Sequence, residues 1–169
     1  MQPVPAPSRH PKGFYANAAT RPAQDLYETP RHAVLHVFSL IPSDVKIIWE
    51  CCYGNGAIYN VLAEAKDELG DQRFRLLGTD LFTEAPDGKV DFLTMEPPAA
   101  PYDMIITNPP YNNKVEWVKK LVATGKPWLI LFPLTAMADV GLSALWTTIG
   151  AKFFYSHAHA ALPARRPRH

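Results

Sequence analysis

Short apolar runs alternate with longer apolar stripes at helical spacing along most of this chain of 169 residues. The runs are rich in β-branched and aromatic side chains, which favour strands. The stripes recur every three or four residues, which favours helices. Strands that alternate with helices in this way form a mostly parallel sheet whose helices cover both faces. The predicted fold class is therefore α/β, with a doubly wound sheet.

The boundaries of these elements follow from turn, capping and helix-breaking residues. Strands are expected at residues 45–50, 74–79, 89–91, 103–107, 128–132 and 152–156. Helices are expected between Pro30 and Pro42, between Gly56 and Gly70, between Asn113 and Gly125, and over residues 142–149. Ligands of doubly wound sheets bind at the carboxyl ends of the strands, so the loops that follow the strands are where a site is expected.

Length and composition exclude several classes of protein. The chain is long enough for one domain with its own core, and it has no apolar run of the roughly 18–20 residues that a membrane span needs. Its two cysteines, Cys51 and Cys52, are neighbours in sequence. Adjacent cysteines suit packed thiols in a reducing compartment better than a disulfide framework. We therefore expect a globular protein of the cytoplasm.

Charge is distributed unevenly along the chain, although the formal net charge is only +1. Residues 51–100 contain four basic and nine acidic side chains, whereas residues 101–169 contain eight basic and three acidic ones. Such segregation is typical of a protein that presents one face to a polyanion. A solvated surface without a partner explains the same distribution equally well.

Three segments with candidate functional residues directly follow predicted strands. Gly54 and Gly56 follow the first strand, Asp80 closes the second, and residues 108–111 follow strand 103–107. Glycine lets the backbone approach a ligand closely. An acid at the end of the second strand can hold the ribose hydroxyls of a nucleoside. A tight turn or a helix cap explains each signal taken alone. Their common position at strand ends indicates a shared site.

The tetrapeptide Asn108-Pro109-Pro110-Tyr111 is the most specific of these signals. Two consecutive prolines remove two backbone N–H groups and fix two φ angles, so the carbonyl groups are held in fixed directions. A rigid turn alone does not need all four residue types. The tetrapeptide is therefore the main candidate for chemistry.

Together these residues resemble the class I S-adenosylmethionine-dependent amino methyltransferases, most closely the adenine-N6 DNA methyltransferases of restriction–modification and phage type. The resemblance spans residues 27–132 in the motif order of that family's gamma group. It implies a Rossmann-like methyltransferase fold, S-adenosylmethionine as the cofactor, and residues 108–111 as the catalytic motif. That motif is typical of methylation of a planar amino nitrogen in DNA, RNA or protein glutamine.

The resemblance also implies a cofactor site. In the family's leading motif Thr29 helps to hold the methionine end of the cofactor, Asp80 corresponds to the acid that binds ribose, and Asp91 with Phe92 corresponds to the pair beside the adenine ring. The remaining members belong to the leading motif, to the loop after strand 45–50 and to the catalytic motif. The expected cofactor-binding residues are Tyr27, Thr29, Pro30, Glu50, Cys51, Tyr53, Gly54, Gly56, Asp80, Leu81, Asp91, Phe92 and Asn108.

The chemistry of this family explains the four residue types of the catalytic motif. The exocyclic amine of adenine is a poor nucleophile because its lone pair is delocalised into the ring. The Asn108 side-chain oxygen and the Pro109 carbonyl can accept hydrogen bonds from that amine, which stabilises the positive charge that grows during attack. Pro110 stiffens the backbone, and Tyr111 can stack on an adenine flipped out of a duplex.

The resemblance implies DNA as the partner, and Lys114, Lys119 and Lys120, which follow the motif, would then lie near phosphates. The expected organisation is a flexible proline-rich arm (1–24), a methyltransferase catalytic domain (25–160) and a basic tail (161–169), without a target-recognition domain. Either a partner protein would then supply target recognition, or the recognised DNA sequence would be short or loosely defined. Only 13 residues follow Ser156, so the hairpin strand that closes this family's sheet is expected to be missing or improvised.

Two other functions compete with this prediction. RNA adenine or protein glutamine offers the same acceptor geometry as DNA adenine. An inactive cofactor-binding subunit of a larger methyltransferase assembly is favoured by the short carboxyl-terminal part and disfavoured by the intact motif at residues 108–111. No membrane partner and no metal are expected, since His157 and His159 have no third ligand at a suitable spacing.

Overall fold

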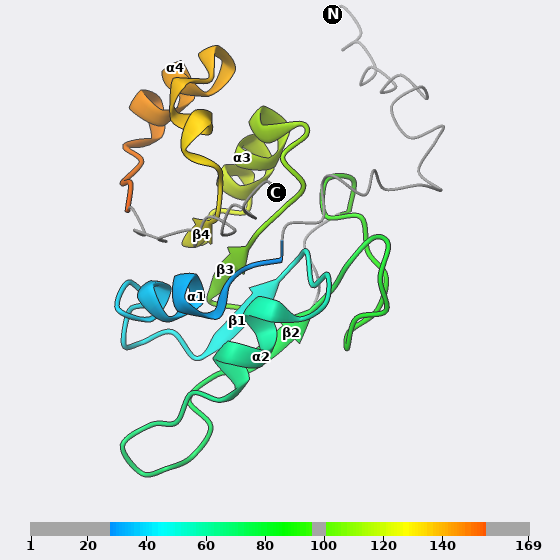
Figure 1. Cartoon of the computed structure of the whole chain (residues 1–169), viewed down its shortest axis with the longest axis vertical. Coiled ribbons are helices and arrows are strands. Elements are labelled where there is room, and N and C mark those ends of the chain that lie inside the picture. The colour runs from blue at the N-terminus through cyan, green and yellow to red at the C-terminus, as the bar shows by residue number, and fades with distance from the viewer. Residues whose placement is uncertain (1–27, 96–100, 155–169) are drawn as a thin grey trace, which may run out of the picture.

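A four-stranded, all-parallel sheet with helices on both faces forms the centre of the computed structural model, which describes residues 28–95 and 101–154 (Figure 1). In chain order the elements are α1 (Arg31–Phe38), β1 (Ile47–Glu50), α2 (Ala57–Ala63), β2 (Arg75–Gly78), β3 (Met104–Thr107), α3 (Lys114–Ala123), β4 (Trp128–Ile130), the 3-10 helix η2 (Leu134–Ala138) and α4 (Val140–Ile149). The predicted α/β class and parallel sheet are confirmed.

The strands follow the spatial order β2-β1-β3-β4. From β1 the chain moves outward to β2, returns across β1 to β3, and then moves outward again to β4. Ile48 of β1 lies opposite Leu76 of β2 on one side and opposite Met104 of β3 on the other. The direction of winding therefore changes between β1 and β3, which is where parallel sheets of this kind open a crevice at the carboxyl ends of their strands.

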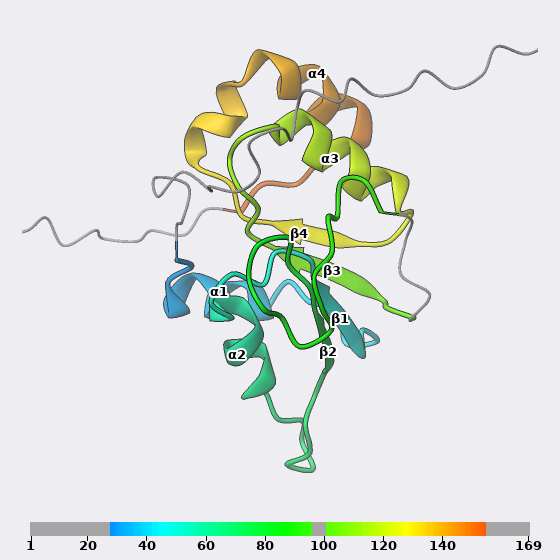
Figure 2. The ribbon, with the colours of Figure 1, turned by 90° about the vertical axis from the view of Figure 1, so that its right-hand side faces the viewer.

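Alternate residues of the strands point to opposite faces of the sheet and produce two separate core layers. The first layer joins α1 and α2 to the sheet and includes Val34, Ile48, Ile58, Leu62 and Ile106. The second joins α3 to the other face and includes Trp49, Phe92, Ile105, Trp117 and Leu121. Figure 2 shows α1 and α2 on one side of the sheet and α3 on the other. The sheet is doubly wound, as predicted.

The helix α4 packs on α3 and η2. Val118, Leu142 and Trp146 form the buried centre of this third cluster, which also receives the half-buried rings of Trp128 and Phe132. Asp139 begins α4 by accepting hydrogen bonds from the backbone N–H groups of residues 141 and 142. The third cluster therefore extends the second core layer outward from the edge strand β4 (Figure 1).

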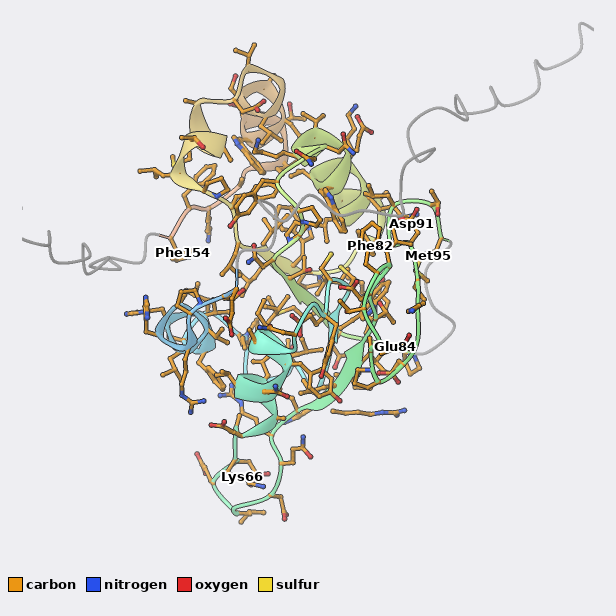
Figure 3. The ribbon with its side chains drawn as sticks, turned by 45° about the vertical axis from the view of Figure 1, so that its right-hand side comes forward. Lys66, Phe82, Glu84, Asp91, Met95 and Phe154 are labelled. Carbon is orange, nitrogen blue, oxygen red and sulfur yellow. The ribbon has the colours of Figure 1, made fainter. Side chains whose placement is uncertain are left out.

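The helix predicted between Gly56 and Gly70 ends early, at Ala63, so Leu69 lies outside it. Leu69 is 87% exposed. The side chain of Asp67 accepts hydrogen bonds from the backbone N–H groups of Leu69 and Asp71, which stabilises a turn in place of another helical turn. Figure 3 shows Lys66, in the same loop, far from Phe82 and Asp91.

Two of the predicted strands also differ from the structure. Residues 89–91 contribute a single bridge, between Asp80 and Lys89. Of segment 152–156 the structure describes residues 152–154, and these are not a strand; Phe153 packs edge-on against Trp146 with the ring centres 5.5 Å apart. Within the described residues the sheet ends at β4. Phe153 contacts α4, so residues 152–154 do not pair with the edge of β4.

Several expectations concern residues outside the described ranges. They are the arm at residues 1–24, Tyr27, His157, His159 and the basic tail at residues 161–169. Among the described residues, no helix combines the length and the apolar character needed to cross a membrane.

Two leucine substitutions test the assignment of the core. Leu121 is fully buried on α3, whereas Leu69 is 87% exposed. We expect Leu121→Ala to lower the free energy of unfolding by about 2–5 kcal/mol, because it removes buried methylene groups and leaves a cavity. Leu69→Ala should change that free energy by less than about 0.5 kcal/mol. Urea unfolding followed by tryptophan fluorescence measures both, and equal losses would contradict the packing described.

Candidate functional site

The carboxyl ends of β2, β1 and β3 bring the three predicted segments to one edge of the sheet. β1 ends at Glu50, and backbone hydrogen bonds connect the loop that follows it to the end of β2: the Thr79 N–H donates to the Glu50 carbonyl at 2.9 Å, and the Tyr53 N–H donates to the Thr79 carbonyl at 3.0 Å. β3 lies on the other side of β1 and leads directly into Asn108. The site edge, as we call it, therefore consists of three adjacent strand ends.

Asp80 anchors the loops of this edge. Its side chain is 2% exposed and accepts three backbone N–H groups: from Gly54 at 2.9 Å, from Phe82 at 2.7 Å and from Thr83 at 3.0 Å. A carboxylate has about four acceptor positions, so about one remains. Binding both hydroxyls of a ribose would thus require Asp80 to give up a backbone hydrogen bond.

Tyr53 explains why two positions near this edge are glycine. A Cβ atom on Gly56, which has φ +79°, would lie 2.7 Å from the Tyr53 hydroxyl, and one on Gly78 would lie 3.0 Å from the Tyr53 ring. Gly54 is different, because no described atom lies within 4 Å of the place where its Cβ would be. The open part of the loop is therefore at Gly54, and the ring of Tyr53 covers Gly56.

Glu50 is a buried acid at the centre of the site edge. It is 3% exposed, and its Oε2 atom has no hydrogen-bond partner among the described residues. The pKa of Glu50 is raised to about 9, mainly by burial and to a smaller extent by the nearby Cys51 and Asp80, although a hydrogen bond from the Tyr59 backbone lowers it. At neutral pH this side chain is therefore an uncharged carboxylic acid that can donate a hydrogen bond.

The adjacent cysteines are packed thiols, as predicted. Both are free, and Cys51 is buried in the second core layer. Burial, followed by the contact with Cys51, raises the pKa of the Cys52 thiol well above its ordinary value. A thiol in such surroundings stays protonated and is a poor nucleophile. Cys51, directly after β1, therefore anchors the start of the loop by packing in the second core layer.

Asn108 is joined to a residue from the beginning of the described chain. Its side-chain Nδ2 donates a hydrogen bond to the Thr29 hydroxyl at 2.9 Å, across 79 positions of sequence. Thr29 is 7% exposed, and the next residue, Pro30, caps α1 with an extended backbone. The structure thus brings together the segment at Thr29-Pro30 and the tetrapeptide at residues 108–111, which are far apart in the sequence.

The other three residues of the tetrapeptide continue along the same edge. Pro109 is buried, whereas Pro110 and Tyr111 are half-buried. The ring of Tyr111 meets Phe132 edge-on, with the ring centres 6.4 Å apart. Phe132 follows β4, so Tyr111 lies between the ends of β3 and β4.

Phe92, which the resemblance places beside the cofactor's adenine, packs in the second core layer. It is 2% exposed, stacks on Trp117 with ring centres 5.2 Å apart and planes 4° apart, and meets the edge of Trp49 at 5.3 Å. Asp91 accepts a hydrogen bond from the Leu93 N–H, which turns the loop. In this arrangement Phe92 is a core residue, because two tryptophans from β1 and α3 enclose it.

Phe82 is a candidate residue that the sequence analysis did not single out. It is 37% exposed, and its backbone is held by Asp80 next to the half-buried Leu81. An aromatic side chain two positions after the acid that ends the second strand was the available signal. Its ring offers an apolar surface beside the anchored loop (Figure 3).

The three lysines expected to meet phosphates differ in their surroundings. Lys120 donates to the Met95 carbonyl and thereby ties α3 to the loop after residue 91. Lys119 forms an exposed ion pair with Glu116 at 3.3 Å, which is weak enough to exchange for another anion. Lys114 begins α3 directly after the tetrapeptide. Lys114 is therefore the nearest of the three to the site edge, and Lys120 has a structural contact of its own.

No protein-family model matches this sequence, and no curated protein matches it either. The assignment of a site therefore depends on the geometry of the chain itself.

The raised pKa of Glu50 predicts a pH dependence of stability. In the unfolded chain this acid titrates near its ordinary value of 4.5, and in the folded chain near 9. The stabilisation from its bound proton is therefore fully present below pH 4.5 and is lost as the pH rises through about 9. In Glu50→Gln an uncharged amide replaces the acid, so the melting temperature of the wild type should fall by several degrees relative to this variant between pH 5 and 9.

Glu64→Gln is the matched control for this experiment. Glu64 is exposed, and its ion pair with Arg31 lowers its pKa, so it stays ionised throughout that range. The melting temperature of Glu64→Gln should change with pH in the same way as that of the wild type between pH 5 and 9. A constant difference between Glu50→Gln and the wild type would rule out a proton on Glu50.

A second prediction concerns the anchoring role of Asp80. In Asp80→Asn, three backbone N–H groups lose a charged acceptor, and the new amide N–H₂ group faces other donors. We expect the free energy of unfolding to fall by about 2–4 kcal/mol. Asp91→Asn should cost under about 1 kcal/mol, because Asp91 accepts one backbone N–H that an asparagine oxygen can also accept. Urea unfolding compares the two, and similar losses would show that Asp80 anchors nothing.

Proposed function

We propose that this protein transfers a methyl group from S-adenosylmethionine to the N6 amine of adenine in DNA. The observation that carries the proposal is the position of Asn108. It follows β3 at the carboxyl edge of a parallel sheet, beside the glycine-containing loop after β1, and its amide is hydrogen-bonded to Thr29. Ligands of such sheets bind at this edge, next to the change in winding direction between β1 and β3.

The residues of the site edge fit the cofactor in three respects. Gly54 has open space where a side chain would be, so a ligand can approach the backbone there. The Glu50 Oε2 atom is buried and has no hydrogen-bond partner among the described residues, which suits a polar ligand group. Asp80 keeps about one acceptor position for a ribose hydroxyl. Gly54, Glu50 and Asp80 would thus hold the cofactor, which supplies the methyl group when bound.

Asn108 and Pro109 would act on the acceptor amine. The Asn108 oxygen and the Pro109 carbonyl would accept hydrogen bonds from its two N–H groups. They would stabilise the positive charge that grows on nitrogen as the N–C bond forms and the S–C bond of the sulfonium breaks, which leaves a neutral thioether. One proton of the amine then leaves to solvent. Amide and carbonyl groups do not titrate near neutral pH, so the reaction needs no general base. Holding the amine in line with the methyl group supplies much of the rate.

The substrate base would reach this edge only from single-stranded DNA or after leaving a duplex. Flipping costs a few kcal/mol, and stacking on an aromatic ring returns about 1–3 kcal/mol. Tyr111 is half-buried between the ends of β3 and β4, where such stacking would occur. Lys114 and Lys119 are the lysines of α3 with the freedom to meet phosphates, because the contact of Lys120 holds the loop at Met95.

Transfer of label from tritiated S-adenosylmethionine tests the proposed reaction. The full chain is incubated with unmethylated DNA, RNA and whole-cell protein as competing acceptors, and the products are hydrolysed and separated. We expect label in N6-methyladenine from DNA. Label in RNA adenine or in glutamine would reassign the acceptor. If calorimetry shows that S-adenosylmethionine binds but no acceptor is labelled, the proposed enzymatic activity is wrong, and a cofactor-binding subunit is favoured.

The variant Asn108→Ala tests the assigned chemistry. Loss of an acceptor that stabilises developing charge should lower kcat by about 100-fold or more, while the Kd of S-adenosylmethionine stays within about twofold. Asn60→Ala is the matched control, because Asn60 is an exposed residue of α2. It should keep wild-type transfer. Undiminished transfer by Asn108→Ala would remove the tetrapeptide from the mechanism.

A further inference from the structure

The contact between Thr29 and Asn108 is unusual in its sequence span and its burial. The two residues are 79 positions apart, and the Thr29 hydroxyl accepts the hydrogen bond from Asn108 Nδ2 at 2.9 Å. Thr29 is 7% exposed and Asn108 is half-buried, so water competes little for this bond. A hydrogen bond in such surroundings fixes the orientation of the groups that form it.

Thr29 is itself held firmly. A residue before proline is restricted to extended backbone, and Pro30 has φ −64° and ψ 138° at the start of α1. The helix α1 is anchored in the first core layer by Val34, which is 1% exposed. The Thr29 hydroxyl is therefore held in place by the backbone on both sides and can orient the amide of Asn108.

The orientation of this amide decides what it can do. An asparagine side chain presents an acceptor oxygen at one end and a donor N–H₂ group at the other. Only the oxygen can accept from an amine; the N–H₂ group would repel it. With Nδ2 turned toward Thr29, Oδ1 is turned away from Thr29.

We infer that Thr29 is a positioning residue, which orients the Asn108 amide so that its oxygen faces the acceptor amine. This role rests on the proposed function, because the direction of the amide matters to catalysis only if Asn108 accepts from that amine. A residue that orients Asn108 affects kcat, whereas a residue that holds the methionine end of the cofactor affects the Kd of the cofactor. The positioning role and the cofactor-binding role therefore predict different effects.

Three variants separate these roles. Thr29→Val keeps the shape of the side chain but removes the hydroxyl, so kcat should fall about five- to tenfold, the loss expected for one neutral hydrogen bond. The KM for DNA and the Kd for S-adenosylmethionine should stay within twofold. Thr29→Ser keeps the hydroxyl and should restore kcat to within about twofold of the wild type. Thr124→Val, at the carboxyl end of α3, serves as the control.

Thr124 is a half-buried threonine whose hydroxyl is also hydrogen-bonded, but it lies away from the site edge. Its Oγ1 donates to the Leu121 carbonyl at 2.6 Å. Loss of this hydroxyl removes one hydrogen bond, so Thr124→Val should lower thermal stability as Thr29→Val does, but leave kcat unchanged. An equal fall of kcat in both valine variants would mean that the effect is general destabilisation, and would overturn the positioning role.

A readout that needs no activity tests the same contact. The Asn108 side-chain N–H₂ signals in a ¹⁵N correlation spectrum are assigned by their disappearance in Asn108→Ala. In Thr29→Val we expect these signals to shift and to exchange with solvent at least fivefold faster, and in Thr29→Ser to stay near their wild-type positions. Unchanged signals in Thr29→Val would overturn the inference.

The two measurements distinguish failure of the inference from failure of the proposed function. If the wild type methylates no acceptor, the proposed function fails, and the amide signals alone decide whether Thr29 orients Asn108. If the wild type methylates DNA and Thr29→Val raises the Kd of S-adenosylmethionine with kcat unchanged at saturation, Thr29 is a cofactor contact and the positioning role is wrong.

Discussion

The arrangement of the site edge depends on one buried carboxylate. Asp80 ends the segment after β2, yet one of its oxygens accepts the N–H of Gly54 from the loop after β1, and the other accepts two N–H groups of its own loop. Charged acceptors form stronger hydrogen bonds than neutral ones, and burial excludes the water that would compete. The carboxylate thereby sets the position of two loops at once. The glycine-containing loop has its conformation because Asp80 holds it on one side and Tyr53 fills it on the other.

The rest of the molecule gives that edge a rigid base. Trp49 of β1 contacts Phe92 and Tyr102, while Phe92 stacks on Trp117 of α3. Large rings contribute much buried area and few rotatable bonds, so they fix the distance between sheet and helix. The loop from Asp91 to Met95 is held at one end by this stack and at the other by Lys120. Phe92 therefore contributes to the packing between sheet and helix.

The sequence predicted the parallel sheet, its four long strands and the gathering of three segments at their carboxyl ends, because periodicity and turn residues are local signals. Periodicity failed where particular side-chain contacts override it. The Asp67 side chain stabilises a turn near Leu69 where a helix was expected, and Phe153 packs on Trp146 where a strand was expected. Local patterns also cannot indicate the hydrogen bond between Thr29 and Asn108, because these residues are 79 positions apart. Nor did periodicity reveal that Tyr53 accounts for Gly56 and Gly78.

The separation of Thr29 and Asn108 also has a consequence for folding. Closing a loop of 79 residues costs conformational entropy before the contact returns any stabilisation, and parallel strand pairs add crossovers of their own. Val34 of α1 and Ile106 of β3 share the first core layer, so apolar packing already brings these two segments together. Apolar packing is not directional, whereas the hydrogen bond fixes one side chain relative to the other. One polar contact therefore joins the beginning of the described chain to the half of the sheet that contains β3 and β4.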